Sequence, residues 1–282
     1  EFMNILLSHI SLIRPLNVIM SGFSIFIASE IIGPDLDKRL VLLLSVIVML
    51  FTSGANALND ALDLKIDLIN RPLRPIPSGK VNIKTAFLLS FIFFIFASLL
   101  CLQLNKNAEF IGIFIAMPIM TLYTTYLKNK PLIGNFSVAF ILSLSFIFCG
   151  AAFNSINPMI IPTLLCFGLS FLRELVKDMA DIEGDKSSGL STFPIYSGFE
   201  NSIKLVIIIS FLIGLGSFIP FLNSTYNLWY LFFLILGVEI PILFIVFLML
   251  KKPSIKSAEK SAKVLKFSTF MGLIAIYTGT IL

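Results

Sequence analysis

The sequence predicts an all-α, polytopic membrane protein with about nine transmembrane helices. Hydrophobic residues make up 57% of the 282 positions, charged residues only 13%, and the mean hydropathy is +0.97. A soluble domain carries about 25% charged residues. The two-residue alternation that is typical of membrane β-strands is absent. Helices are therefore the expected spanning elements.

Nine apolar segments come close to the roughly 20 residues that a helix needs to cross a bilayer. They are 13–32, 39–59, 84–104, 108–126, 131–152, 158–176, 201–221, 227–250 and 263–281. The fourth contains Pro118, and the sixth ends among charged residues, so these two have the weakest pattern. We expect one membrane domain over residues 3–282, made of two pseudo-repeated halves.

The basic residues are distributed unevenly between the connections. Connections after even-numbered segments carry most of the loop lysines and arginines, whereas those after odd-numbered segments carry only Lys38, Arg39 and Lys106. Basic loops stay on the cytoplasmic side. We therefore expect a multi-pass protein of the cell membrane with its N-terminus inside. The net charge of +5 bears on this topology and does not indicate a nucleic-acid partner.

Two further features have structural interpretations only. Glu1 and Phe2 precede Met3 and are expected to be a vector-derived scar. The three cysteines lie inside apolar segments without the spacing of metal ligands, so we expect neither a disulfide framework nor a zinc site.

An acidic motif follows the second apolar segment. On a helix, Asp60, Asp63 and Asp67 would stack along one face, where their charges repel one another. A bound divalent cation removes that repulsion. Mg²⁺ suits the motif best, because it binds one or two carboxylates and accepts phosphate oxygens of a substrate.

The same spacing returns after the sixth segment, in Asp178, Asp181 and Asp185, which lie 118 positions downstream (178 − 60). A single acidic cluster could also be explained as a solvated helix end without a metal-binding role. Two copies at equal spacing and in equivalent positions favour a metal-binding role. Both motifs lie at the expected cytoplasmic face, and the connections 60–83 and 178–200 that follow are expected to cover a shared site.

Several other polar residues near the cytoplasmic ends of the segments are expected to bind substrate. Arg71 and Arg74, between prolines that stop a helix, suit bidentate phosphate contacts. The remaining candidates are Asn17, Asn56, Asn59, Tyr123, Lys128, Arg173, Lys177 and Asp178. Single residues such as Asn17 can equally form hydrogen bonds between helices.

Two acidic clusters, several cations and a membrane location together indicate a reaction class. Metal ions held by carboxylates can bind a diphosphate and stabilise it as a leaving group. A membrane setting implies an apolar donor. We therefore expect ionisation of an allylic isoprenoid diphosphate and capture of the carbocation by an acceptor in the membrane.

The motifs Asn59-Asp60-x-x-Asp63-x-x-x-Asp67 and Asp178-x-x-Asp181-x-x-x-Asp185, with Arg71-Pro-x-Arg74-Pro-Ile-Pro-Ser-Gly between them, resemble the UbiA superfamily of intramembrane prenyltransferases. Nine spans around a central cavity match that architecture over essentially the whole chain. Lys80 departs from the pattern, because relatives often have arginine there and lysine loses the bidentate geometry.

The resemblance implies roles for individual residues. Asp63, Asp67, Asp181 and Asp185 are expected to be catalytic through the metal ions. The expected metal ligands are Asn59, Asp60, Asp63, Asp67, Asp178, Asp181 and Asp185. Within this set, Asp60, like Asn56, either adds to the ligands of the first cluster or supports them, and Asp178 either supports the second cluster or lies near the acceptor. Arg71, Arg74 and Lys128 would hold the diphosphate.

Within the superfamily, the segments 69–72 and 173–185 are most similar to the enzymes that form the second ether bond of archaeal lipids. That similarity implies geranylgeranyl diphosphate as donor, geranylgeranylglyceryl phosphate as acceptor and Mg²⁺ as cofactor, with membrane lipid around the protein. We expect Arg173 and Lys177 to bind the phosphate of the acceptor.

Two alternatives stay open. A UbiA-type enzyme can take an aromatic or chlorin acceptor, such as 4-hydroxybenzoate, a naphthoate or chlorophyllide, and the Pro-Ile-Pro-Ser-Gly loop does not separate these acceptors. A cation transporter is the alternative from another class. The acidic motifs cluster on one side of the membrane, and we expect no ionisable residues through the outer half of the spans, which disfavours a transporter.

Overall fold

The computed structural model describes residues 2–281, in which helices are the only regular elements and no strand occurs. The first half comprises α1 (Phe2–Leu12), α2 (Pro15–Ile32), α3 (Lys38–Leu62), α4 (Leu64–Asn70), α5 (Ile83–Cys101), α6 (Lys106–Phe110), η1 (Ile111–Ala116), α7 (Met117–Thr125) and η2 (Leu127–Asn129). The second half comprises α8 (Ile133–Ala152), η3 (Asn157–Met159), α9 (Ile160–Ala180), α10 (Ile182–Ser187), α11 (Phe193–Ser197), α12 (Phe199–Leu222), α13 (Leu228–Leu234), η4 (Ile235–Glu239), α14 (Ile240–Lys251) and α15 (Ile255–Ile281).

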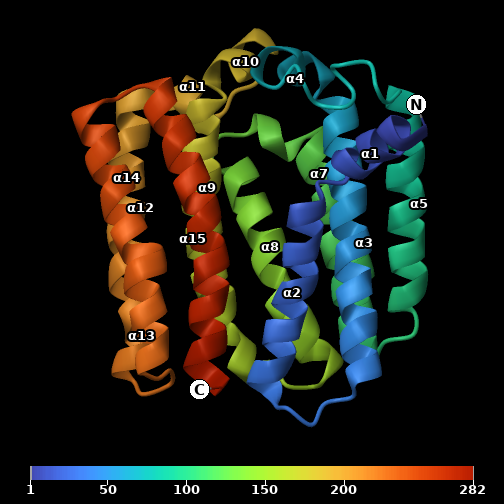
Figure 1. The fold of residues 1–282 in the computed structure, drawn as a ribbon, viewed down its shortest axis with the longest axis vertical. Helices are drawn as coiled ribbons and strands as arrows, with labels where there is room; N and C mark the ends of the chain where they lie inside the picture. Colours follow the sequence, from blue (N-terminus) through green and yellow to red (C-terminus); the bar gives the residue numbers. More distant parts are fainter. Residues whose placement is uncertain (1, 282) are drawn as a thin grey trace.

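Each predicted apolar segment corresponds to one long helical stretch, so the all-α membrane fold is confirmed. Within residues 2–281, eight helical stretches are long and apolar enough to cross a membrane. The ninth predicted segment is the C-terminal part of α15, which begins earlier than predicted and is more polar, with Ser257, Ser261 and Ser268 buried along it. α15 nevertheless runs the height of the bundle beside α9 (Figure 1). Of the expected scar, Glu1 lies outside the described residues.

Two spans continue through a short π-helix where the sequence contains proline. The fourth span contains η1 just before Pro118, and the eighth contains η4 just before Pro241. Proline removes one backbone N–H, and a wider turn accommodates the missing bond without ending the helix. The proline in the fourth segment is thus tolerated within a spanning helix.

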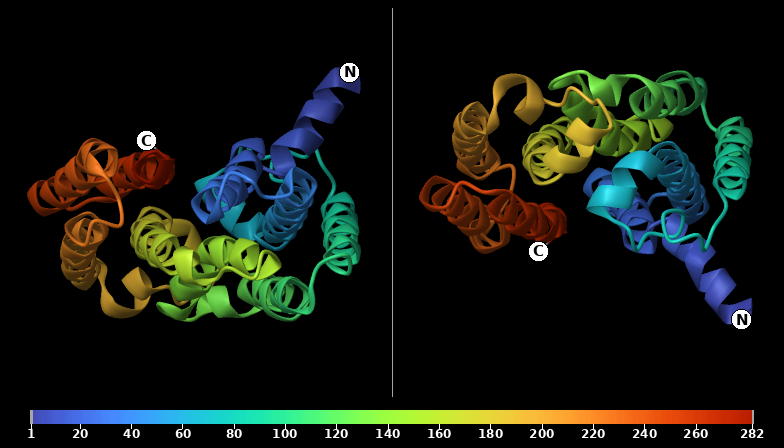
Figure 2. Two further views of the ribbon diagram at one scale, coloured as in Figure 1. Left: turned by 90° about the horizontal axis from the view of Figure 1, so that it is seen from below. Right: turned by 90° about the horizontal axis from the view of Figure 1, so that it is seen from above.

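The bundle has two groups of helices joined through its centre. The C-terminal helices α12, α13, α14 and α15 lie on one side, and α2, α3, α5 and α7 lie on the other, with α8 and α9 between them (Figures 1 and 2). α4, α10 and α11 lie at the end of the bundle where α1 lies, and the end of α15 lies at the opposite end (Figure 1). This placement agrees with the expected odd number of crossings.

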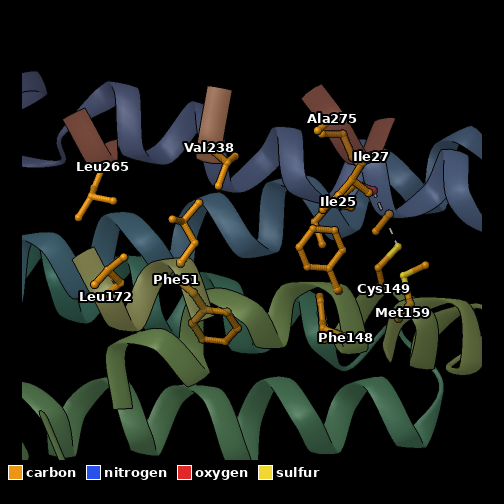
Figure 3. Packing of buried hydrophobic residues seen from close by; sticks show 14 of the residues in the cluster. Ile25, Ile27, Phe51, Phe148, Cys149, Met159, Leu172, Val238, Leu265 and Ala275 are labelled. Carbon is orange, nitrogen blue, oxygen red and sulfur yellow. Dashed lines mark hydrogen bonds between the residues drawn. The ribbon is translucent and has the colours of Figure 1, made fainter. Parts of the chain in front are cut away.

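A continuous apolar core joins the groups. Side chains from α2, α3, α8, α9 and α15 interdigitate there, including Ile25, Phe51, Phe148, Leu172 and Ala275 (Figure 3). Cys101 and Cys149 pack within this core as free thiols. The core fixes α3 and α9 relative to each other, and these two helices carry the acidic motifs.

One expectation about the spans was wrong. Glu239 lies in the middle of the span Leu228–Lys251, where it accepts a hydrogen bond from Ser217 Oγ at 2.8 Å. An ionisable group therefore does occur away from the acidic motifs. It lies among α12, α13 and α14, in the side group of helices.

Candidate active site

The two acidic motifs have the same backbone geometry. α3 ends before Asp63 (φ −91°, ψ 12°) and α4 starts after it, while α9 ends before Asp181 (φ −94°, ψ 5°) and α10 starts after it. In both, the amide of the residue four positions beyond the break, Asp67 or Asp185, donates to the carbonyl of the break residue. The repeated sequence spacing is thus a repeated local structure.

This break corrects the expectation that three carboxylates stack on one continuous helix. Asp63 and Asp67 line a central cavity at the α4 end of the bundle, but Asp60, on α3, does not. In the second motif all three aspartates line the same cavity. Aspartate is a weak helix former, and the break lets the second half of each motif turn over the end of the bundle.

Most of the predicted site residues come together in this central cavity. The ones that line it are Asn59, Asp63, Asp67, Arg71, Arg74, Tyr123, Lys128, Lys177, Asp178, Asp181 and Asp185. They come from α3, α4, α7, η2, α9, α10 and the loop after α4. Helices that are distant in sequence therefore bring both motifs to one place.

Cations and amides engage the carboxylates of the cavity. Lys128 Nζ forms an ion pair with Asp63, and Arg74 Nη1 donates to Asp67 at 2.6 Å. Asn135 Nδ2 donates to Asp178 at 2.7 Å. The site therefore pairs cations from one element with carboxylates from another.

Arg71 joins the two motifs directly. Its Nη2 donates to both carboxylate oxygens of Asp181, at 2.6 and 2.9 Å, and its Nη1 lies 3.8 Å from Asp67. Arg71 is positioned by its place at the end of α4, where Pro72 prevents the helix from continuing.

Asn70 holds α4 against α10. Its Nδ2 donates to the carbonyl of Asp181 at 3.1 Å, and its Oδ1 accepts from the amide of Gly184 at 3.2 Å. A Cβ at Gly184 would collide with the Asn70 side chain. Asparagine at the end of α4 and glycine in α10 thus let the two motif segments approach closely.

Four predicted site residues lie outside the cavity lining. Asn56 Nδ2 donates to the carbonyl of Ile13 at 2.8 Å, which ties α3 to the turn between α1 and α2, and Asn17 does not line the cavity. Asp60 forms ion pairs with Arg14 and Arg74. Arg173 Nη1 donates to Glu174 at 3.0 Å, and only Lys177 of the predicted acceptor pair lines the cavity.

Four polar residues that we had not assigned to the site also line the cavity, namely Arg14, Asn135, Glu174 and Thr192. Glu174 is buried between Arg173 and Lys177, whose Nζ donates to it at 2.8 Å. Asn135 and Glu174 are polar residues at the ends of apolar segments, which was the available signal. Arg14 lies before Pro15, and nothing in its local sequence marked it.

Burial shifts the acidity of the aspartates outside the spans. Burial raises the pKa of Asp185 to about 7, with the neighbouring charge of Asp181 adding to the effect. The pKa of Asp67 is also raised by burial, which outweighs the opposing effect of Arg74. Removal of water disfavours the charged form of a carboxyl group. A nearby cation would therefore stabilise the ionised form of both carboxyl groups.

The donor set of the cavity fits a hard divalent cation. Its carboxylates and the amide oxygen of Asn59 are all oxygen donors, which Mg²⁺ and similar ions prefer. Among the described residues, however, no three His, Cys, Asp or Glu side chains converge on one metal position. Asp63, Asp67 and Asp181 are instead each paired with a lysine or an arginine.

The fold and cavity define a helical membrane protein with a charged cavity at one end of the bundle. Residues 18–271 match the pattern of the UbiA prenyltransferase family, and the chain belongs to that family. It is therefore a multi-pass membrane prenyltransferase.

Relatives with known names cover nearly the whole chain. Digeranylgeranylglyceryl phosphate synthase of Methanococcoides burtonii is 34% identical, over 96% of this chain and 99% of the relative. A solved digeranylgeranylglyceryl phosphate synthase structure has a TM-score of 0.77 at 31% identity, covering 98% of this chain and 99% of that one. A UbiA homolog from Archaeoglobus fulgidus bound to DMAPP and Mg²⁺ has the same fold, with a TM-score of 0.66 at 16% identity, covering 98% and 100%.

Proposed function

We propose that this protein transfers a geranylgeranyl group from geranylgeranyl diphosphate to the sn-2 hydroxyl of geranylgeranylglyceryl phosphate, releasing diphosphate. Full-length relatives that carry the name digeranylgeranylglyceryl phosphate synthase support this reaction. The structural basis of this proposal is that residues of both acidic motifs and the basic residues Arg71, Arg74 and Lys128 line one cavity.

The proposed cofactor is Mg²⁺, which Asn59, Asp63 and Asp67 would hold from one motif and Asp181 and Asp185 from the other. The homolog from Archaeoglobus fulgidus, described with DMAPP and Mg²⁺, supports this choice. When bound, Mg²⁺ supplies Lewis-acid stabilisation of the negative charge on the leaving diphosphate. Asp178, the first carboxylate of the second motif, would support this second cluster without being one of the metal ligands.

The protein's cations stabilise the leaving group. Arg71, Arg74 and Lys128 give up their carboxylate partners in the cavity and donate to phosphate oxygens instead. The bond between C1 of the prenyl chain and the bridging oxygen breaks, and the electron pair leaves with the diphosphate. The acceptor hydroxyl oxygen then forms the C–O bond to C1 and loses its proton. Because that hydroxyl becomes acidic during attack, the reaction needs no strong base.

Lys177 binds the phosphate of the acceptor, with Arg173 beside it. Lys177 lines the cavity, and Glu174 lies between the two cations. An aromatic acid has less need of two adjacent cations than a phosphate monoester has. This feature favours the lipid-phosphate acceptor over the aromatic one.

The cavity faces the cytoplasm, with the N-terminus inside, because the basic connections lie at that end of the bundle. The chain forms one domain whose two halves are pseudo-repeats. The equal backbone breaks at Asp63 and Asp181 support this relation.

The test is a transfer assay with detergent-solubilised protein, radiolabelled geranylgeranyl diphosphate and Mg²⁺. Geranylgeranylglyceryl phosphate and 4-hydroxybenzoate are offered in parallel, with Asp63→Asn and Asp181→Asn as variants. We expect a labelled lipid phosphate that is lost in both variants. Transfer only to 4-hydroxybenzoate would overturn the acceptor and the role of Lys177. Magnesium flux in vesicles without prenyl transfer would instead support a transporter.

A further inference from the structure

We infer that Asp60, although it belongs to the first acidic motif, is a positioning residue that orients Arg14 and Arg74 toward the diphosphate and does not bind metal. The inference rests on the proposed function, since it concerns the binding of the prenyl diphosphate. It separates Asp60 from Asp63 and Asp67, with which the sequence spacing groups it.

The surroundings of Asp60 are those of a counter-ion for arginine. The residue is only 2% exposed, and Arg14 and Arg74 both donate to its Oδ1. Arg74 uses the same Nη1 to contact Asp67 at 2.6 Å, inside the cavity. Asp60 thus holds a guanidinium group whose other contact is a cavity carboxylate.

Arg14 has one hydrogen-bond donor that no protein group pairs with. Its Nε is buried and has no hydrogen-bond partner, although the residue lines the central cavity. A buried donor without an acceptor costs free energy. Phosphate oxygens entering the cavity would supply that acceptor.

The backbone of Arg14 supports a functional reason for its placement. It has φ 56° and ψ 72°, in the left-handed region, at the turn between α1 and α2. Non-glycine residues adopt this region at a cost, and such strain persists where the surroundings fix it. The ion pair with Asp60 is such a constraint.

A divalent cation does not fit beside Asp60. Asp60 is buried outside the lining of the cavity in which the metal would be held, and its Oδ1 already accepts from two guanidinium groups. The equivalent residue of the second motif, Asp178, lines the cavity and contacts the neutral amide of Asn135. The first carboxylates of the two motifs therefore have different partners and different roles.

The experiment compares Asp60→Asn with Asp63→Asn, using Mn²⁺ as the metal probe. Binding of Mn²⁺ to substrate-free protein is measured by electron paramagnetic resonance, and binding of geranylgeranyl diphosphate is measured directly alongside the transfer kinetics. For Asp60→Asn we expect an Mn²⁺ affinity within twofold of wild type and a KM for geranylgeranyl diphosphate at least tenfold higher. Asp63→Asn should lose Mn²⁺ affinity at least tenfold.

Arg14→Gln provides an independent variant should Asp60→Asn not fold. It should raise the KM for the diphosphate and leave Mn²⁺ binding unchanged, and the double variant should be no worse than either single one. Glu109→Gln is the carboxylate control, because Glu109 also pairs with a cation, Lys106, and neither residue lines the cavity.

Loss of Mn²⁺ affinity in Asp60→Asn equal to that in Asp63→Asn would overturn the inference. A fall in kcat and thermal stability with an unchanged KM, in either variant, would reduce Asp60 to a purely structural role and also overturn it. If wild-type protein binds geranylgeranyl diphosphate but transfers it to no lipid phosphate, the proposed function fails while the Asp60 inference is still decided by the binding data.

Discussion

Arg71 donates through one nitrogen to both carboxylate oxygens of Asp181, 110 positions away in the chain, at 2.6 and 2.9 Å. This contact makes the basic loop of the first half and the acidic motif of the second half parts of one site. If Arg71 binds the diphosphate as proposed, phosphate oxygens would compete with this carboxylate for the guanidinium.

Arg71→Lys tests the geometry of that guanidinium. Lysine keeps the charge but is a point donor without the fork of arginine. We expect kcat/KM for the prenyl diphosphate to fall roughly 10- to 100-fold, the range for loss of one preorganised donor or supporting contact. Lys80→Arg, at an exposed position of the same loop, is the matched control and should change kcat/KM less than about twofold. Equal kinetics for Arg71→Lys and wild type would mean that only charge matters.

Gly184→Ala tests the close approach of α4 and α10. The added Cβ would displace Asn70, which makes two hydrogen bonds across this junction, so Asp181 and Asp185 should shift relative to Arg71. We expect a loss of activity of roughly tenfold or more, since supporting contacts around metal ligands typically carry 10- to 100-fold effects.

Gly216→Ala, in α12, is the control for that variant, because its added Cβ meets nothing within 4 Å. It should keep activity and gain up to about 0.5–1 kcal/mol of helix stability. A Gly184→Ala enzyme that retained full activity would show that the Asn70 contacts are not needed to hold the motifs together.

Lys177→Met and Arg173→Met test the acceptor phosphate site. Lys177 lines the cavity and Arg173 does not, so the lysine change should raise the KM for geranylgeranylglyceryl phosphate more, roughly tenfold for loss of a charge-assisted contact. The KM for geranylgeranyl diphosphate should stay nearly constant in both. A larger effect from Arg173→Met, or an effect on the donor alone, would contradict the assignment.

Acidity should weaken metal binding through Asp185. Its pKa of about 7 in the metal-free protein means that the carboxyl is ionised above that pH and protonated below it. A metal binds the ionised form, so below pH 7 it must displace a proton and its apparent affinity falls, by up to about tenfold per pH unit. Mn²⁺ titrations at pH 6, 7 and 8 measure this slope. Asp185→Asn should bind more weakly and lose the slope between pH 6 and 8.

The spans and most of the cavity residues were predictable from the sequence, because long apolar segments and a repeated acidic spacing depend only on local order. The separation of Asp60 from Asp63 and Asp67 was not. It depends on the helix breaking at Asp63, where neither proline nor glycine gives a signal, and on Arg14 approaching from another helix. Asn70 and Glu174 likewise gain their roles only from neighbours that tertiary packing supplies.

The π-turn before Pro118 was equally hidden. A proline in an apolar segment predicts a kink or an end, and the sequence does not say that η1 absorbs the missing bond. Glu239, by contrast, is visible in the sequence as a single carboxyl group within the apolar segment 227–250.

The nearly equal numbers of acidic and basic side chains in the cavity bear on how metal and diphosphate bind. Six carboxylates (Asp63, Asp67, Glu174, Asp178, Asp181 and Asp185) and five cationic side chains (Arg14, Arg71, Arg74, Lys128 and Lys177) line it. With all of them ionised, the cavity is close to electroneutral before any ligand arrives. An uncompensated charge in such an environment costs several kcal/mol. Metal ions alone or diphosphate alone would unbalance the cavity, whereas both together restore the balance, so donor and metal should load cooperatively.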